Sequence, residues 1–222
     1  MGKRGPKPKG KVKIAWSPQF AYAIGLLVSD GNLSPDGRHI NFTTTDVELI
    51  ELFQSSLAII ATVTVKRRGA GEVKKCYAVQ FGDVLFYNFL LQVGLTPKKS
   101  KTIGIIDVPP KYFFDFLRGV FDGDGSTHSY FDKRWKNSFM FYTIFASASE
   151  DFIEWLRSQI NQTLALHGHV TRAQGHSVIQ LKYAKTESLV LLQKMYQNQE
   201  LPSLTRKRLK IDAMLRIIGE SL

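Results

Sequence analysis

Residues 117–126 read LRGVFDGDGS, an apolar stretch that runs into two aspartates separated by glycines. Residues 23–32 read AIGLLVSDGN and repeat this pattern with one of the two acids. Both stretches have the apolar character of a buried helix, and both end in an Asp-Gly step, at Asp30 and at Asp124. The fold has to account for an acid at the end of an apolar helix, twice.

Small residues recur at helical spacing in both stretches. Gly25 and Ser29 are four residues apart in the first, and Gly119 and Gly123 are four apart in the second. Residues at i and i+4 share a helix face. A glycine inside a helix costs about 1 kcal/mol relative to alanine, so a close contact must offset it. The spacing predicts that the two helices pack directly on each other through these small residues.

The two acids indicate a cation site. Asp30 and Asp124 stand at helix C-termini, where a negative charge meets the negative end of the helix dipole. Parallel packing of the helices would also bring the two carboxylates together, which adds repulsion between like charges. Oxygen ligands in small number suit Mg²⁺ completed by water and phosphate oxygens. A pair of carboxylates holding a divalent metal against phosphodiesters is typical of metal-assisted hydrolysis.

Two other interpretations apply to the same acids. An EF-hand loop could begin at Asp122, with Asp124 and Ser126 as further ligands, but Thr127 occupies its glycine position and Lys133 its glutamate position. An Asp-Gly step can also be a purely structural helix end. Its recurrence in register within a repeat favours a functional role.

The chain repeats itself beyond these stretches. INFTTTDVELIELFQ at 40–54 aligns without gaps to TIFASASEDFIEWLR at 143–157, and LTPKKSK at 95–101 has a counterpart in LPSLTRKR at 201–208. Helical and strand periodicities alternate in the same order in both halves. We therefore predict an α+β protein made of two similar repeats, 16–108 and 109–222, preceded by a basic flexible arm at 1–15.

Hydrophobic periodicity and turn residues place the individual elements. Helices are expected at 17–31, 46–60, 83–93, 112–124, 149–166, 186–197 and 205–218. Strands are expected at 37–45 and in three hairpins, 63–81, 126–147 and 169–183.

Basic residues are concentrated at the N-terminus. The net charge is +11, from 30 Lys and Arg against 19 Asp and Glu. Six basic residues fall in the first thirteen positions: Lys3, Arg4, Lys7, Lys9, Lys11 and Lys13. Residues 1–13 lack hydrophobic periodicity and should be disordered alone. They resemble arms that lie in the DNA minor groove, although a solubilising tail fits equally well. The surplus positive charge favours a nucleic acid partner.

Other features restrict the compartment. Cys76 is the single cysteine, so internal disulfides are excluded. The N-terminus lacks the apolar core of a signal peptide, and the longest apolar run is too short to cross a bilayer. We expect an intracellular, soluble protein, in a bacterial cytoplasm or an organelle.

Residues 23–31, AIGLLVSDG, and 117–125, LRGVFDGDG, resemble the motif of the LAGLIDADG homing endonucleases. The resemblance covers nearly the whole chain after the arm, and it implies two pseudo-symmetric αββαββα repeats. Each repeat would carry a four-stranded antiparallel, saddle-shaped sheet, and the two motif helices would pack together at the centre. It further implies a monomer that cuts both strands of a long double-stranded DNA target, leaving short 3′ overhangs, in the process of intron homing.

The resemblance also implies the active-site residues. Asp30 and Asp124 would be catalytic and bind Mg²⁺ or Mn²⁺, with backbone near Gly31 and Gly125, while Ca²⁺ would support binding without cleavage. Val28 stands where the second motif has Asp122, a position that usually faces away from the metals. Each site would add a basic residue, for which the candidates are Lys98, Lys99 and Lys101 in one repeat and Arg206, Lys207 and Arg208 in the other. We choose Lys99 and Lys207. A polar residue falls near Asp46 and Ser149, which could equally be helix N-caps.

DNA contacts should lie on the polar faces of the strands. In the first repeat the candidates are His39, Asn41, Thr43, Thr64, Lys66, Arg68 and Gln80. In the second they are His128, Tyr130, Arg172, Gln180 and Lys182. A slip of one residue in register would reverse the face of any of them.

Other functions remain open alongside cleavage. An RNA maturase that assists intron splicing would have the same fold and the same basic charge. Two intact acids favour a DNA endonuclease. A transcription factor on this fold would usually carry an added helix-turn-helix domain. An intein is disfavoured by Met1 and the C-terminal sequence GESL.

Overall fold

The computed structural model describes residues 10–68, 74–135, 138–172 and 177–222. The first half contains, in chain order, α1 (Pro18–Asp30), β1 (Gly31–Leu33), β2 (His39–Thr44), α2 (Val47–Leu57), β3 (Val63–Arg68), β4 (Lys74–Gly82), α3 (Val84–Gln92) and a short 3₁₀ turn, η1 (Lys99–Lys101). The second half contains η2 (Pro110–Tyr112), α4 (Phe113–Asp124), β5 (Ser126–Phe131), β6 (Phe139–Ser147), α5 (Glu150–Leu164), β7 (His169–Arg172), β8 (Ile179–Ala184), α6 (Lys185–Met195) and α7 (Thr205–Ile217).

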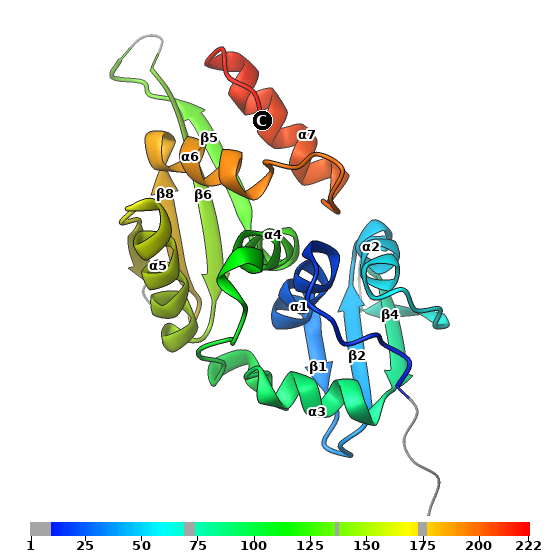
Figure 1. Ribbon diagram of the computed structural model, residues 1–222. Helices are drawn as coiled ribbons and strands as arrows, with labels where there is room; N and C mark the ends of the chain where they lie inside the picture. The colour runs from blue at the N-terminus through cyan, green and yellow to red at the C-terminus, as the bar shows by residue number, and fades with distance from the viewer. Residues whose placement is uncertain (1–9, 69–73, 136–137, 173–176) are drawn as a thin grey trace, which may run out of the picture.

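The strands form two antiparallel four-stranded sheets with the same topology. The strand order is β1-β2-β4-β3 in the first sheet and β5-β6-β8-β7 in the second. Figure 1 shows α1 and α4 side by side at the centre, with one sheet on each side of the pair. The predicted α+β class and the two-repeat architecture with paired motif helices are therefore confirmed.

The two central helices interlock at their glycines. A Cβ added at Gly25 would lie 2.2 Å from the carbonyl oxygen of Phe116, and one at Gly119 would lie 2.1 Å from that of Tyr22. Farther along, a Cβ at Gly123 would meet the side chain of Ser29 at 2.4 Å. The backbones thus occupy the space that side chains would take, which explains why glycine is tolerated inside both helices.

Both central helices turn directly into a strand. Ser17 caps the start of α1 by accepting a hydrogen bond from the Phe20 amide at 3.1 Å, and Pro18 takes the first helical position, as predicted. At the other end Gly31 has extended backbone, with φ −85°, rather than the left-handed conformation common at helix ends. Glycine is needed because a Cβ there would lie 2.5 Å from the Leu27 carbonyl oxygen.

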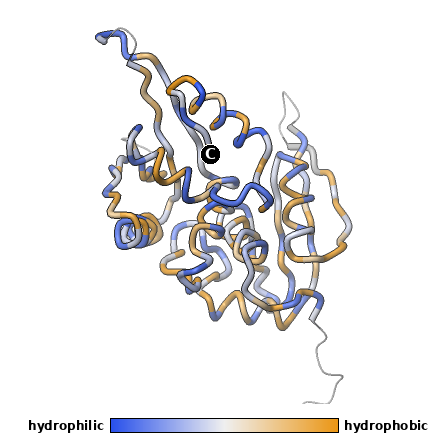
Figure 2. The backbone as a smooth tube through the Cα atoms, turned by 45° about the horizontal axis from the view of Figure 1, so that its top comes forward, coloured by the Kyte–Doolittle hydropathy of each residue, from blue (hydrophilic) through white to orange (hydrophobic). Residues whose placement is uncertain are grey.

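The packing of each sheet follows from strand alternation. Ile40 and Phe42 on β2 are fully buried, as are Phe141 and Phe145 on β6, and α2 and α5 cover these faces. Figure 2 shows hydrophobic positions recurring along helices and strands, mixed with hydrophilic ones. Within the described residues, the helices are too short or too polar to traverse a bilayer.

Two local features differ from the expectations. No separate strand was expected at β1, because its three residues are too few to show alternation. Residues at the end of the predicted flexible arm are held to the body. The amides of Lys11 and Val12 both donate to the Asp83 carboxylate, at 2.6 and 2.9 Å, and Val12 is buried. Asp83 also caps α3, so one buried acid serves both purposes.

Candidate active site

The two acids at the helix ends lie close together. Asp30 ends α1 and Asp124 ends α4, and the interlocked helices bring these ends side by side. A Cβ at Gly123 would lie 3.6 Å from Oδ2 of Asp30, so the Asp30 carboxylate rests against the last turn of α4. Asp30 is half-buried, and Asp124 is the more exposed of the two. The close helix contact predicted from the small residues thus places the acids as expected.

One buried lysine caps each of these helices. Nζ of Lys99 donates to the carbonyl oxygens of Val28, at 2.5 Å, and Ser29, at 3.2 Å. Nζ of Lys207 donates to those of Phe121 and Gly125, both at 2.6 Å, and of Gly123 at 3.2 Å. A cation at a helix C-terminus is stabilised by the unpaired carbonyls and the helix dipole. The two lysines therefore offset part of the cost of the two acids.

The charges of the four groups are coupled. Burial, and then the negative charge of Asp124, raise the pKa of Asp30 to about 6 against the opposing effect of the two lysines. Burial also raises the pKa of Asp124. The pKa of Lys99 and that of Lys207 fall to about 8, again mainly because of burial. At neutral pH Asp30 is therefore mostly ionised and both lysines are mostly protonated.

The donor set fits a divalent cation. Two adjacent carboxylates whose ionised forms are disfavoured by burial gain from a bound cation. Among the described residues, no three or more His, Cys, Asp or Glu side chains gather around one point. The protein would therefore supply Asp30 and Asp124, and other ligands would have to come from backbone, water or substrate. The Gly125 carbonyl, expected near the metal, accepts the hydrogen bond from Lys207.

A pocket of about 260 Å³ opens beside the acids. Its wall includes Ser29 and Asp124 from the motif helices, the side chain of Lys99, residues 146–148 at the end of β6 and the ring of Phe152. The pocket therefore joins the end of the motif helices to the loop that leads into α5. This loop contains the Ser149 position predicted to serve the second site.

Asp46 and Ser149 are both helix caps. Asp46 accepts from the Glu48 amide at 3.2 Å, and its other oxygen binds Nε of Arg206 at 2.7 Å. Ser149 accepts from the Phe152 amide at 3.5 Å and donates to the Ile103 carbonyl. The gapless alignment of 40–54 with 143–157 thus corresponds to equivalent positions in the fold. Arg206, a candidate basic residue, is engaged with Asp46 and not with the acids.

The polar candidates of the first sheet share one face. Asn41 pairs with Gln80, and Thr43 and Thr64 both pair with Ala78, so their side chains lie on the same side as His39. The opposite side carries the buried Ile40 and Phe42. Lys66 and Arg68 follow Thr64 at alternate positions of β3, so their positions belong to the same face, but their side chains lie outside the described residues.

The second sheet brings together four of its five candidates. His128 pairs with Tyr142, and Lys182 and Gln180 pair with the next two positions on the same face, Ile144 and Ala146. Tyr130 lies on that face as well.

Arg172 does not share this face. It pairs with the buried Ile179, and its guanidinium binds Glu150 at 2.8 Å. The register of β7 is shifted by one residue from the expectation, which places His169 and Thr171 on the polar face instead. Apolar residues alternate along β8, with Ile179 and Leu181 on the buried face. Pairing β7 with this pattern could have revealed the shift.

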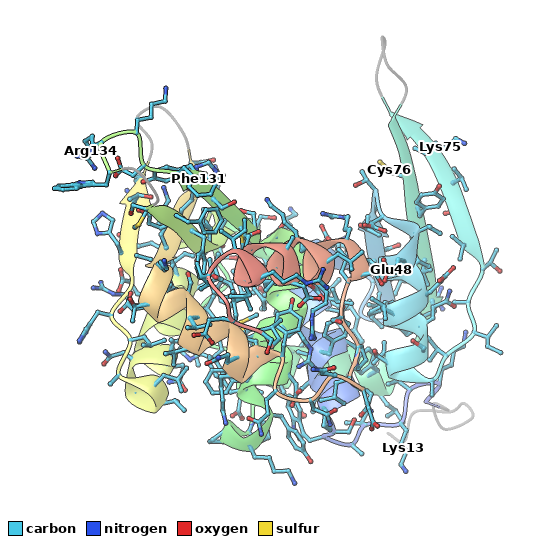
Figure 3. All side chains as sticks on the ribbon, turned by 90° about the horizontal axis from the view of Figure 1, so that it is seen from above. Lys13, Glu48, Lys75, Cys76, Phe131 and Arg134 are labelled. Atoms are coloured by element: carbon cyan, nitrogen blue, oxygen red, sulfur yellow. The ribbon has the colours of Figure 1, made fainter. Side chains whose placement is uncertain are left out.

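Hairpins extend both polar faces on opposite sides of the molecule. Seen from above, the ends of the β3–β4 hairpin, near Lys75 and Cys76, and of the β5–β6 hairpin, near Phe131 and Arg134, project in the same direction (Figure 3). The molecule thus has the outline of a saddle, with one hairpin on each side.

The contacts of Asp122, a position expected to face away from the metals, were not predicted from the sequence. Asp122 is fully buried, where it accepts hydrogen bonds from the Tyr22 hydroxyl at 2.8 Å and the Leu204 amide at 2.7 Å. Burial raises its pKa to about 6. The signal available in the sequence was the mismatch with Val28, which showed that this position differs between the repeats.

Comparisons with solved structures identify the fold. The I-LtrWI LAGLIDADG homing endonuclease bound to target DNA superimposes with a TM-score of 0.60 at 10% identity, over 90% of each chain. The homing endonuclease I-DmoI in complex with DNA and Ca gives a TM-score of 0.56 at 13% identity, over 87% of this chain and 97% of that one. The chain therefore has the two-repeat LAGLIDADG fold.

A similar structure also comes from another kind of protein. Full-length DUF199/WhiA from Thermatoga maritima gives a TM-score of 0.55 at 12% identity, over 94% of this chain and 63% of that chain. The chain thus spans less than two thirds of the length of WhiA. Comparison with the sequence patterns of known families gives no match, and neither does comparison with curated proteins.

Proposed function

We propose that the protein is a site-specific DNA endonuclease that makes a double-strand break by hydrolysing phosphodiesters with a divalent metal, Mg²⁺ or Mn²⁺. It would act as a monomer on a long double-stranded target and leave short 3′ overhangs. The solved structures of similar fold include homing endonucleases bound to DNA, which supports DNA as the partner.

The observation that carries this proposal is the group of four charges at the helix ends. Asp30 and Asp124 lie side by side, each on a helix whose last carbonyls are capped by a buried lysine. A structural helix end would require neither the acid nor the buried ammonium group. The combination of an acid and a buried lysine occurs at the end of each motif helix, as the hydrolysis of two DNA strands would need.

The residues divide the chemistry between them. A divalent cation held by Asp30 and Asp124 would neutralise charge on the scissile phosphate and activate water. The ammonium groups of Lys99 and Lys207 would stabilise the negative charge that develops on phosphate oxygens, because they are fixed in place by helix carbonyls. With a pKa of about 8, each Nζ stays mostly protonated at neutral pH. Lys99 donates to two carbonyls, which leaves a third N–H that can donate to a leaving oxygen, whereas Lys207 donates to three and would act through its charge.

The polar sheet faces would bind the DNA. His39, Asn41 and Gln80 in the first sheet, and His128 and Lys182 in the second, are of the types that read base edges or contact phosphate. The basic residues of the N-terminal arm would add phosphate contacts beyond the first sheet. Lys11 lines the same pocket as His39 and Gln80, so it would direct the arm toward the first sheet.

The decisive experiment is selection of cleavable sites from a randomised double-stranded DNA library in the presence of Mg²⁺. Recovery of one related set of sequences, cut on both strands, is the expected result. A protein that binds DNA without cutting any member in Mg²⁺ or Mn²⁺ would refute the endonuclease proposal.

Variants of the acids connect the activity to the site. Asp30→Asn and Asp124→Asn should each reduce double-strand cleavage sharply and preserve binding, measured in Ca²⁺. Asp107→Asn, at an exposed aspartate between the two motifs, serves as the matched control and should cut normally. Undiminished cutting by either active-site variant would remove the shared-metal arrangement.

A second candidate is nucleic acid binding without cleavage. The similarity to WhiA shows that the fold is not limited to proteins described as endonucleases. The same library, scored for retention instead of cutting, and an RNA pool offered alongside it, would distinguish this function and the maturase alternative from the endonuclease.

A further inference from the structure

The segment between α6 and α7 is fastened to one face of α4. Arg118 and Asp122 stand four residues apart on that face and are both buried. The Arg118 guanidinium donates to the carbonyl oxygen of Pro202 at 2.8 Å and to that of Met195. Asp122 then receives the backbone amide of Leu204 at 2.7 Å. Two charged side chains of α4 thus hold both ends of this segment.

Leu204 is the cap residue of α7. Its carbonyl oxygen accepts the amides of Lys207 and Arg208, each at 3.0 Å, which begins the helix. The Asp122 carboxylate therefore fixes the first turn of α7, and a negative charge at a helix start is also favoured by the dipole. Lys207 lies in this turn and reaches back to the carbonyls of Phe121 and Gly125, on either side of Asp122 at the end of α4.

Both central helices contribute to this contact. The second partner of Asp122 is the hydroxyl of Tyr22, which comes from α1 and is itself fully buried. The carboxylate thus connects α1, α4 and the start of α7 at one point. A change in the Asp122 position would be transmitted to Lys207 through a single backbone hydrogen bond.

The motif helix of the first repeat lacks this pair of charged residues. Motif alignment places Ile24 opposite Arg118 and Val28 opposite Asp122, and both first-repeat side chains are apolar. Lys99 is held instead by its own bonds to the Val28 and Ser29 carbonyls and by the turn η1. The two lysines therefore occupy equivalent places, but they are supported differently.

We infer that Asp122 is a positioning residue for Lys207, so that the two halves of the catalytic centre depend on different supports. The inference deepens the proposed function and rests on it for its catalytic meaning. The structural part, that Asp122 controls Lys207 and not Lys99, stands on the contacts alone.

The test is pulsed acylation of lysines in the whole protein, with acetic anhydride as the probe and modification read by mass spectrometry. Lys99 is the internal reference, because it is also buried and also donates hydrogen bonds to the last carbonyls of a motif helix. Asp122→Val copies the first repeat and removes the carboxylate. Lys207 should then react about tenfold faster relative to Lys99, the change expected when the hydrogen bond from the Leu204 amide to the charged carboxylate is lost.

Three further variants make the result specific. Asp122→Asn retains an oxygen for the Leu204 amide and should restore most of the protection of Lys207, even if the valine variant folds poorly. Tyr22→Phe removes the other partner and should have a smaller effect. Val28→Ala truncates the matching position and should leave both lysines unchanged, since Lys99 bonds to the backbone of residue 28.

The outcomes separate the inference from the proposed function. An unchanged Lys207 in Asp122→Val, or an equal acceleration of Lys99 and Lys207, would overturn the positioning role. Selective exposure of Lys207 in a protein that cuts no DNA would preserve this role and refute the endonuclease. On a selected DNA site, Asp122→Val should slow the cutting of one strand more than the other.

Discussion

Asp30→Asn should make the metal-free protein more stable at neutral pH while it removes cleavage. Burial raises the pKa of Asp30 from 3.8 to about 6, a shift that already includes the attraction of the two lysines. At ~1.36 kcal/mol per unit this corresponds to about 3 kcal/mol of destabilisation of the ionised form. Partial exposure of the side chain reduces the expected gain for the uncharged variant to about 1–2 kcal/mol.

The sign of the pH dependence follows from proton binding. Between pH 3.8 and about 6 the folded protein binds more protons at Asp30 than the unfolded chain does, so wild-type stability falls as pH rises through this window. Asparagine does not titrate. The difference between variant and wild type should therefore be near zero below pH 4 and complete above pH 6.

Urea unfolding in EDTA at pH 4 and at pH 7.5 measures this difference. Asp107→Asn is the control, because an exposed aspartate should contribute little at either pH. In wild type, added Ca²⁺ should recover stability at pH 7.5, and it should not do so in Asp30→Asn. A variant less stable than wild type at pH 7.5, or equally stabilised at both pH values, would show that Asp30 is not destabilised by its surroundings.

Three other predictions concern activity, packing and affinity. Cleavage at a metal concentration below saturation should decline as pH falls below about 6, because protonated Asp30 binds a cation weakly, and a cleavage rate that stays unchanged from pH 5 to 8 would contradict this. Gly119→Ala should lower the free energy of unfolding by at least ~2–3 kcal/mol, since its Cβ would lie 2.1 Å from a backbone oxygen of α1; an unchanged melting temperature would refute the interlock. Deleting residues 1–9 keeps the contacts of Lys11 and Val12 with Asp83, so the fold should persist while DNA affinity falls, most at low salt. Equal affinity at all salt concentrations would make this segment a solubility device.

The sequence predicted the features that depend on local spacing. The glycine pairs, the Ser17 cap and the Asp46 and Ser149 caps follow from residue type and position, and the structure shows them. Lys99 and Lys207, chosen from two basic loops, point back to the ends of α1 and α4. Their selection required the family resemblance, because spacing alone does not distinguish Lys207 from Arg206 or Arg208.

The features that escaped prediction depend on contacts between distant segments. Asp122 meets Leu204 across 82 residues, and the Asp83 carboxylate meets Val12 across 71. Arg172 lies on the covered side of its sheet because the register of a four-residue strand is set by its partner β8. A periodic pattern cannot report such pairings, because it describes one segment at a time.

The mutual fit of Gly25 and Gly119 sets a rule for building chimeras. Each glycine exists because the other helix passes through the space of its missing side chain. A half taken from a related protein can replace either repeat only if its own motif helix carries small residues in the same phase along the contact. Halves chosen for their DNA preferences should therefore be screened first for this match, and pairs that fail it should be redesigned at both helices together.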